Sequence, residues 1–200
     1  ASRPQRPTIS LKEAEAIARD RFGIDGEVSE LASYIDQNFL VRTPAVGWVL
    51  KIANESEDED TLDFQNQAML RVHEREPGLV PSVLRSIEGR DIETIEIEGR
   101  PHLVRMVSFL EGELLSDAHH VDANTWHSLG SALARIDRAL DGWEHRAMDR
   151  SLRWDLATSP WTIGETTHFD ATERKLLQHH QLQFLGHVVR QLDDLPHGVI

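Results

Sequence analysis

The 200-residue sequence contains no cysteine, which excludes disulfide bonds and thiolate metal sites. It has no apolar run near the length of a membrane span, and no hydrophobic signal core follows its first residues. Basic residues are scarce, with 21 Lys and Arg against 34 Asp and Glu. The net charge of -13 opposes binding to nucleic acid or to anionic membrane surfaces. We therefore expect a cytoplasmic protein that binds neither.

Apolar residues are plentiful enough for a packed core. They make up 40% of the chain, which at 200 residues suits one medium domain or two small lobes. The sequence pattern changes near residues 110–116, where strand-like segments give way to helical ones. We expect an α+β protein with a first lobe over residues 1–112 and a helical second lobe over 113–200.

The first lobe shows helix and strand signals in alternation. Ser10 and Glu13 form a capping box, and the acidic run 55–60 suits the N-terminus of a second helix better than a metal site. The expected elements are a helix over 10–23, strands between 27 and 54, a helix over 61–75, and an antiparallel meander with strands at 83–87, 92–97 and 102–109.

The second lobe shows helical periodicity alone. Apolar residues recur at spacings of three and four, which predicts a long helix with a buried face; they are Trp126, Leu129, Leu133, Ile136, Leu140 and Trp143. Asp170 and Glu173 then repeat the capping pattern before another amphipathic helix. This half of the sequence gives no strand signal.

One lysine stands out because it lies in an apolar strand. Alternation along residues 47–52 places Trp48, Leu50 and Ile52 on one side, and Val49 and Lys51 on the other. A partly buried ammonium group needs an anion, and phosphate is a natural one. Lys51 is therefore the first candidate for a functional residue.

Four segments together resemble one family. They are the string 33–39 (SYIDQNF), the strand ending in Lys51, the pair Gln65-Asn66, and residues 103–112 (LVRMVSFLEG). The sequence resembles the aminoglycoside phosphotransferase and choline kinase superfamily from about residue 31 onward. It is most similar to the hydroxylysine-kinase-like branch, which also occurs fused to class III aminotransferases. The resemblance implies a protein-kinase-like fold, with an antiparallel-sheet N-lobe and an incomplete helical C-lobe.

The resemblance also implies an ATP site. Lys51 would contact the nucleotide phosphates, a polar turn at 33–38 would cover them, and residues 107–110 would form the hinge that pairs with adenine. The implied nucleotide-binding residues are Lys51, Ser33, Asp36, Gln37, Asn38, Gln65, Ser108, Phe109 and Leu110. Leu40, Val49 and Met106 either sandwich the adenine ring or simply belong to the core.

The sequence departs from the family pattern in two places. Kinase-like folds hold the lysine with an acidic side chain on the following helix, but Gln65 and Asn66 stand here, so the partner of Lys51 stays open. The family's His-x-Asp catalytic loop is also missing, and residues 195–200 look like its lead-in. His168-Phe169-Asp170 has the right letters but precedes a capped helix. We identify no catalytic residue and no metal ligand, and we expect the Mg2+ ligands in a C-terminal part that this fragment lacks.

Two functions from different classes remain open. The chain is either the N-terminal fragment of an ATP-dependent kinase for a hydroxyl of an amine-bearing small molecule, inactive by itself, or a catalytically silent regulatory domain of another enzyme. Asp36, Glu111 and Glu113 either contact a cationic substrate or are solvated loop residues. An incomplete helical lobe would expose apolar surface, so we also expect self-association or further domains of the parent chain.

Overall fold

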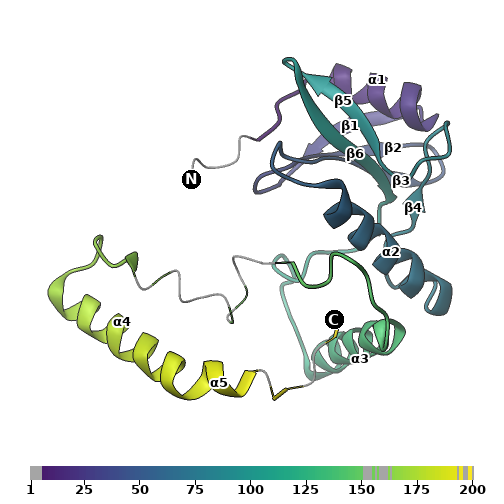
Figure 1. Cartoon of the computed structure of the whole chain (residues 1–200). Coiled ribbons are helices and arrows are strands. Elements are labelled where there is room, and N and C mark those ends of the chain that lie inside the picture. Colours follow the sequence, from purple (N-terminus) through teal and green to yellow (C-terminus); the bar gives the residue numbers. More distant parts are fainter. Residues whose placement is uncertain are drawn as a thin grey trace. The chain divides into compact units, whose positions relative to one another are not determined.

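The computed structural model describes residues 6–150, 155, 157, 162, 164–192, 194–195 and 198–199. The chain divides into two compact units, residues 1–147 and 148–199, which we describe one at a time. Figure 1 labels the elements of both units along the chain.

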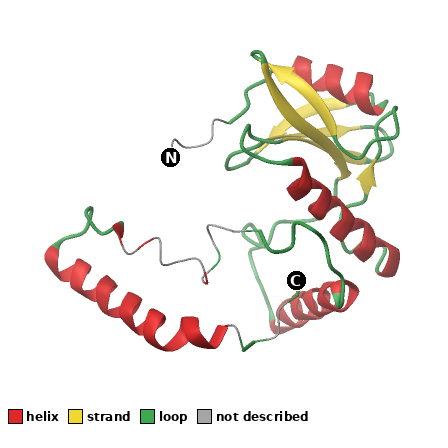
Figure 2. Cartoon of the chain, viewed as in Figure 1, coloured by secondary structure: helices red, strands yellow, loops and turns green. Residues whose placement is uncertain are grey.

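The first unit contains one antiparallel sheet with helices. Its elements are α1 (Leu11–Phe22), β1 (Glu27–Leu31), β2 (Gln37–Arg42), β3 (Gly47–Ile52), α2 (Glu59–Arg75), β4 (Val83–Leu84), β5 (Glu93–Ile97), β6 (Arg100–Ser108) and α3 (Ala123–Leu140). The strand order is β1-β2-β3-β6-β4, and β5 also pairs with β6. Figure 2 shows the strands in yellow and the helices in red. This architecture confirms the predicted α+β class.

The core lies between α1 and one face of this sheet. Ser10 and Glu13 form the predicted capping box, and Gly23 ends the helix in the left-handed conformation with φ 68°. Ala14, Ala18 and Phe22 of α1 are buried against strand residues of the same face. Those strand residues are Phe39, Val41, Leu50, Ile52, Val104 and Met106, all 0% exposed.

The predicted meander is wrong in its pairing. β4 has only two residues, and it pairs with β6 rather than with β5. The hydroxyl of Ser86 accepts hydrogen bonds from the N–H groups of Glu88 and Arg90, and the Ser86 N–H donates to the carbonyl of Arg90. These bonds close a turn where we expected the end of a strand, so Ile87 is 66% exposed. β5 and β6 do form the expected hairpin.

The predicted buried face of α3 is also wrong over most of its length. Trp126, Leu129 and Leu133 are 56%, 41% and 53% exposed, whereas the buried residues of the helix are Ala139 and Leu140 at its C-terminal end. Arg71 and Arg75 of α2 hold that end by donating hydrogen bonds to the carbonyl of Ala139.

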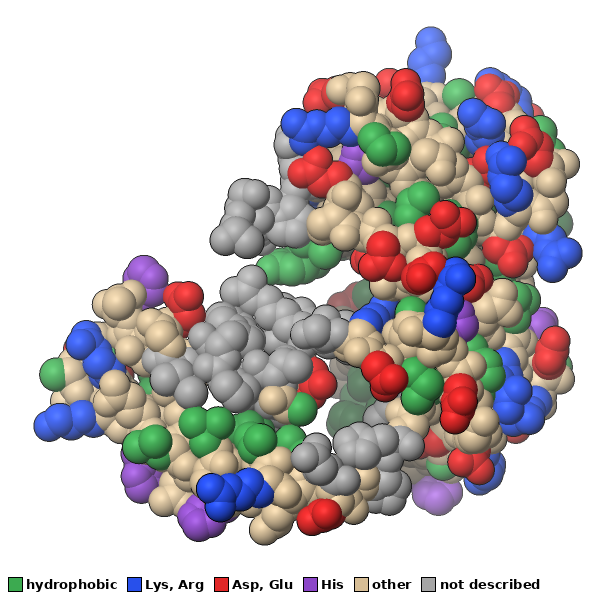
Figure 3. Space-filling view, viewed as in Figure 1, with side chains coloured by type: hydrophobic (Ala, Val, Ile, Leu, Met, Phe, Trp, Pro, Cys, Tyr) green, Lys and Arg blue, Asp and Glu red, His purple; other side chains and the backbone are tan. Residues whose placement is uncertain are grey.

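The second unit is helical in its described residues. It contains α4 (Ala171–Gln183), a π-helical turn (Phe184–Val188) and α5 (Val189–Leu192). Asp170 accepts hydrogen bonds from the N–H groups of Thr172 and Glu173, which confirms the predicted cap. Leu176, Leu182 and Val188 are exposed, and Figure 3 shows hydrophobic side chains along this helical segment. No helix in the described residues is long and apolar enough to cross a membrane.

Candidate functional site

The sheet face opposite α1 carries a polar row. Asn38 of β2 lies directly opposite Lys51 of β3, and Lys51 lies directly opposite Arg105 of β6. Residues directly opposed in antiparallel strands project from the same face, so these three side chains form one row across the sheet. The next row on this face is apolar and consists of Leu40, Val49 and Val107. The alternation predicted for residues 48–52 is confirmed.

Lys51 is partly buried and has no partner. No described residue forms a hydrogen bond or an ion pair with its ammonium group. Burial and then the nearby charge of Arg105 lower the pKa of Lys51, and the carboxylate of Asp36 opposes that shift. This strand therefore presents a partly desolvated cation that forms no ion pair with a described residue.

Arg105 takes the partners that sequence analysis associated with Lys51. It is 5% exposed, and its Nη1 donates a 2.7 Å hydrogen bond to the Oδ1 of Asn66, while Nη2 donates to the Oε1 of Gln65. Burial lowers the pKa of Arg105, and the charges of Asp36 and Glu57 oppose the change. Both α2 acceptors are neutral amides, so they satisfy the guanidinium without cancelling its charge.

The predicted nucleotide-binding residues in the turn between β1 and β2 do not all lie on the same face of the sheet. Oδ1 of Asp36 accepts 3.0 Å hydrogen bonds from the N–H and the side chain of Asn54. Gln37 is 4% exposed, and its amide bonds to the backbone of Ile9 and to Glu30. The structure therefore does not bring Gln37 together with Lys51, because strand alternation turns its side chain to the α1 side.

Asn38 and Ser33 are the other predicted residues of this turn. Asn38 does lie beside Lys51, and its Oδ1 is buried without a hydrogen-bond partner in the described part of the chain. Ser33 lies between β1 and β2 and is partly buried. An unpartnered amide oxygen next to an unpartnered ammonium group marks this end of the face as polar and incomplete.

The predicted hinge follows β6. The N–H of Ser108 donates to the carbonyl of Ser82, and the N–H of Phe109 donates to the carbonyl of Gly47, both at 2.8 Å. Gly47 permits this approach, because a Cβ there would lie 3.0 Å from the Cβ of Phe109. Leu110 is 44% exposed, and its N–H bonds to no described residue. Of the N–H groups of Ser108, Phe109 and Leu110, that of Leu110 is the one available to a ligand.

Met106 does not belong to this face. It is 0% exposed in the core under α1, on the opposite side from Leu40 and Val49. The hypothesis that Met106 contacts a ring is therefore wrong, and Val107 takes its place beside Val49. The acidic candidate Glu111 pairs with Arg42 at 2.8 Å, and Glu113 is exposed.

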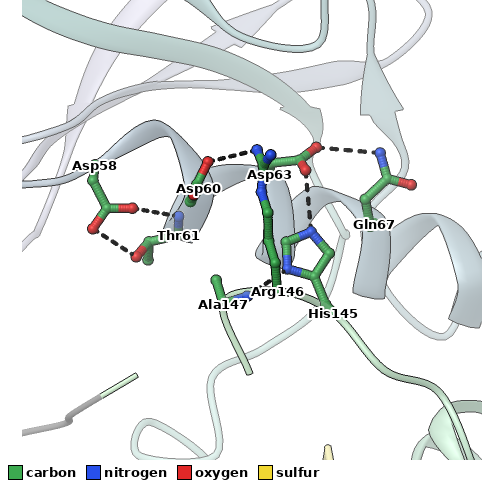
Figure 4. Close-up of polar contacts among 8 residues, drawn as sticks. All are labelled: Asp58, Asp60, Thr61, Asp63, Gln67, His145, Arg146 and Ala147. Atoms are coloured by element: carbon green, nitrogen blue, oxygen red, sulfur yellow. Dashed lines mark hydrogen bonds and ion pairs between the residues drawn. The ribbon is translucent and has the colours of Figure 1, made fainter. Parts of the chain in front are cut away.

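The other side of α2 is fixed by the segment after α3. Trp143 stacks on Phe64 with ring centroids 5.5 Å apart and planes 3° apart. Nε2 of His145 lies 3.1 Å from Oδ2 of Asp63, and Arg146 pairs with Asp60 (Figure 4). Because the Nδ1 of His145 accepts from the N–H of Ala147, the ring presents its N–H to Asp63. These contacts hold the helix that carries Gln65 and Asn66.

Neither His-x-Asp triplet of the sequence presents a free carboxylate. Asp170 caps α4, as predicted. Sequence analysis missed a second triplet, His120-Val121-Asp122, whose aspartate accepts hydrogen bonds from the N–H and hydroxyl of Thr125 and caps α3. Hydrogen bonds from Thr125 lower the pKa of Asp122. Among the described residues, no group of three His, Asp or Glu side chains is placed to hold a metal ion.

Comparison with known families fits this architecture. The model of the phosphotransferase enzyme family matches residues 27–200. The chain therefore belongs to this family, within the aminoglycoside phosphotransferase and choline kinase superfamily suggested by the motifs. No curated protein matches the chain.

Solved structures share the protein-kinase-like fold. A microcompartment-associated aminopropanol kinase is 18% identical with a TM-score of 0.66, and the match covers 92% of this chain and 58% of the kinase chain. An amicoumacin kinase in complex with AMP-PNP and Ca2+ is 14% identical with a TM-score of 0.64, covering 94% and 55%. A spectinomycin phosphotransferase with ADP and spectinomycin is 11% identical with a TM-score of 0.55, covering 89% and 53%. The chain thus spans little more than half the length of these proteins.

Proposed function

We propose that this chain supplies the nucleotide-binding lobe of an ATP-dependent small-molecule phosphotransferase. The observation that carries the proposal is Lys51, a partly buried ammonium group without a partner, beside the amide-bound Arg105. Unpaired buried charge is unfavourable, and a polyphosphate would relieve it. Phosphoryl transfer depends on such positive charge to neutralise the phosphates.

The two rows of this face suit the two ends of ATP. The apolar residues Leu40, Val49 and Val107 would pack on the adenine ring, and the N–H of Leu110 would donate to its edge. The polar row, with the turn at 33–36, would lie along the phosphates. Asp36 would keep Asn54 in place rather than bind a substrate.

The acceptor and the catalytic step belong to the same proposal. We propose a hydroxyl of an amine-bearing small molecule as acceptor. The structurally similar aminopropanol kinase and spectinomycin phosphotransferase support this choice. The described residues offer no catalytic aspartate and no ligand set for Mg2+, so we give Mg2+ no role through them. We propose that residues 1–112 form the nucleotide lobe, that 113–200 begin the helical lobe, and that this chain alone transfers no phosphate.

The alternative is a catalytically silent domain that regulates another enzyme. The observation behind it is that both His-x-Asp aspartates are helix caps, so neither is left as a base. Phosphoryl transfer to an amino alcohol by a protein that contains this chain would contradict the alternative. ATP binding without transfer by that protein would support it.

Calorimetric titration with ATP tests the nucleotide site itself. We expect wild-type protein to bind ATP and Lys51→Met to lose binding. Lys12→Met is the matched control, because Lys12 is an exposed lysine of α1. Equal affinity in wild type and Lys51→Met would contradict the proposal.

A further inference from the structure

Arg105 is a buried arginine whose hydrogen-bond acceptors are neutral side-chain amides. Several arginines of the described chain pair with carboxylates, among them Arg6 with Glu30, Arg42 with Glu111, Arg90 with Glu93 and Arg135 with Glu76. Arg105 is more deeply buried than these, yet its two hydrogen-bond partners are the amides of Gln65 and Asn66. Among the acidic residues that the structure describes, none forms an ion pair with this guanidinium.

We propose that Arg105 is a positioning residue that anchors α2 to the sheet, and that the neutrality of its anchor preserves positive charge for a polyphosphate. This inference rests on the proposed nucleotide site. In protein kinases, the strand lysine itself forms an ion pair with a glutamate of the following helix. Here the anchor uses Arg105 instead, so Lys51 is not consumed in holding α2 and stays available to the ligand.

The charge balance of the face supports this division of roles. Lys51 and Arg105 lie directly opposite on β3 and β6, close enough that the arginine lowers the pKa of the lysine. A carboxylate on α2 would relieve that repulsion, but it would also cancel half of the charge offered to phosphates. Two carboxylates act on this pair through space, Asp36 on both cations and Glu57 on Arg105, and Asp36 has one oxygen bonded to Asn54. The amide acceptors therefore anchor α2 without placing a third negative charge in direct contact with Arg105.

The substitution Gln65→Glu tests the inference, because it adds one negative charge with almost no change in shape. The carboxylate can accept the same hydrogen bond from Arg105, so we expect the protein to fold with an unchanged or higher melting temperature. The affinity of Gln65→Glu for adenine nucleotides should fall more as the charge of the nucleotide increases. For ATP we expect a loss of about tenfold, because the interaction between two unit charges at short range in a protein is worth about 1.4 kcal/mol or more. Affinity for adenosine, which has no phosphate, should not change.

Titrations of ATP, ADP, AMP and adenosine at low salt give this gradient directly. Gln178→Glu is the matched control, since it makes the same change on an exposed position of α4 and should leave all four affinities unchanged. Arg105→Lys is the complementary variant. It keeps the charge but loses the two-pronged contact, so it should lower the melting temperature and retain most of the ATP affinity.

The outcomes separate this inference from the nucleotide site itself. If wild-type protein binds no ATP, or binds it independently of Lys51, the proposed function fails. If wild type binds ATP through Lys51 but Gln65→Glu binds it equally well, only the role of Arg105 fails. An unfolded Gln65→Glu protein, or an equal loss of ATP and adenosine affinity, also overturns the role of Arg105.

Discussion

Leu50 and Lys51 are neighbours in β3, yet they belong to two different environments. Leu50 is 0% exposed and packs with Phe39 and Met106 beneath α1. Lys51 projects from the opposite face, where Asn38 and Arg105 flank it and where no residue that the structure describes forms an ion pair with it. One face of the sheet is a closed apolar core, and the other is a polar surface with charge left over.

The difference shows how stability and function are divided within one sheet. Complete burial of a leucine side chain stabilises a fold by about 1.5–3 kcal/mol. Lys51 does the opposite, because its lowered pKa means that burial disfavours its charged form in the free protein. The core face therefore stabilises the free protein, whereas the polar face carries a partly buried charge that the proposed polyphosphate would neutralise.

The largest effect should come from the core face. Leu50→Ala removes a fully buried side chain under α1, and we expect the free energy of unfolding to fall by about 2–5 kcal/mol in urea denaturation. Val49→Ala, one residue away on the other face, is the matched control and should cost less because Val49 is only partly buried. Equal losses for both variants would contradict the contrast between the faces.

A second test compares two tryptophans, Trp126 in α3 and Trp143 in the segment that follows α3. Trp143→Ala removes the stack on Phe64 and should lower the free energy of unfolding by about 1–2 kcal/mol, of which the aromatic pair contributes about 0.5–1.5 kcal/mol. Trp126→Ala changes a side chain that is 56% exposed and should cost under about 0.5 kcal/mol. If Trp126→Ala proves the more costly, α3 is packed in solution in a way that these contacts do not show.

A third test concerns the start of α2, which carries the Arg105 anchor. Asp58 accepts a 2.7 Å hydrogen bond from the N–H of Thr61. Asp58→Ala should therefore reduce the free energy of unfolding by about 1 kcal/mol. Asp20→Ala, an exposed change on α1, should have little effect on the urea midpoint. Identical midpoints for Asp58→Ala and wild type would show that the cap adds nothing.

The smallest expected effect is a pH dependence from the polar face. The pKa of Lys51 in the folded protein lies below its usual value of 10.5, so the native state binds fewer protons than the unfolded state between those two values. Wild-type stability should gain from Lys51 as pH rises through this window. Lys51→Met should therefore unfold at a higher temperature than wild type at neutral pH, with the gap narrowing at alkaline pH. A gap that widens with pH would reverse the sign of the argument.

The sequence predicted the local features of this fold better than its long-range pairings. Strand alternation correctly placed the side chains of Lys51 and Leu50 on different faces of the sheet. The capping residues Ser10 and Asp170 marked two helix starts. Both signals depend on residues that are close in sequence. The role of Arg105 depends on the register between β3 and β6, which are separated by a helix and two strands. Its position in the quoted motif 103–112 was visible, but its partners were not.

The errors have the same origin. β4 pairs with β6 rather than with β5, since hydrogen bonds to Ser86 close a local turn that the apolar pattern does not reveal. The apolar stripe of α3 was correct as a pattern, but periodicity cannot say which surface covers it. The sequence left Met106 open between the adenine ring and the core because its strand register was unknown, and the structure places it in the core.

NMR of protein labelled at lysine tests the central claim most directly. The sequence has three lysines, Lys12, Lys51 and Lys175, so Lys51→Met assigns the signal of Lys51 at once. We expect that signal to show a pKa below the usual lysine value of 10.5, and this pKa to rise when ATP is added. A Lys51 pKa that is not lowered in the free protein, or a Lys51 signal unchanged by saturating ATP, would contradict the account.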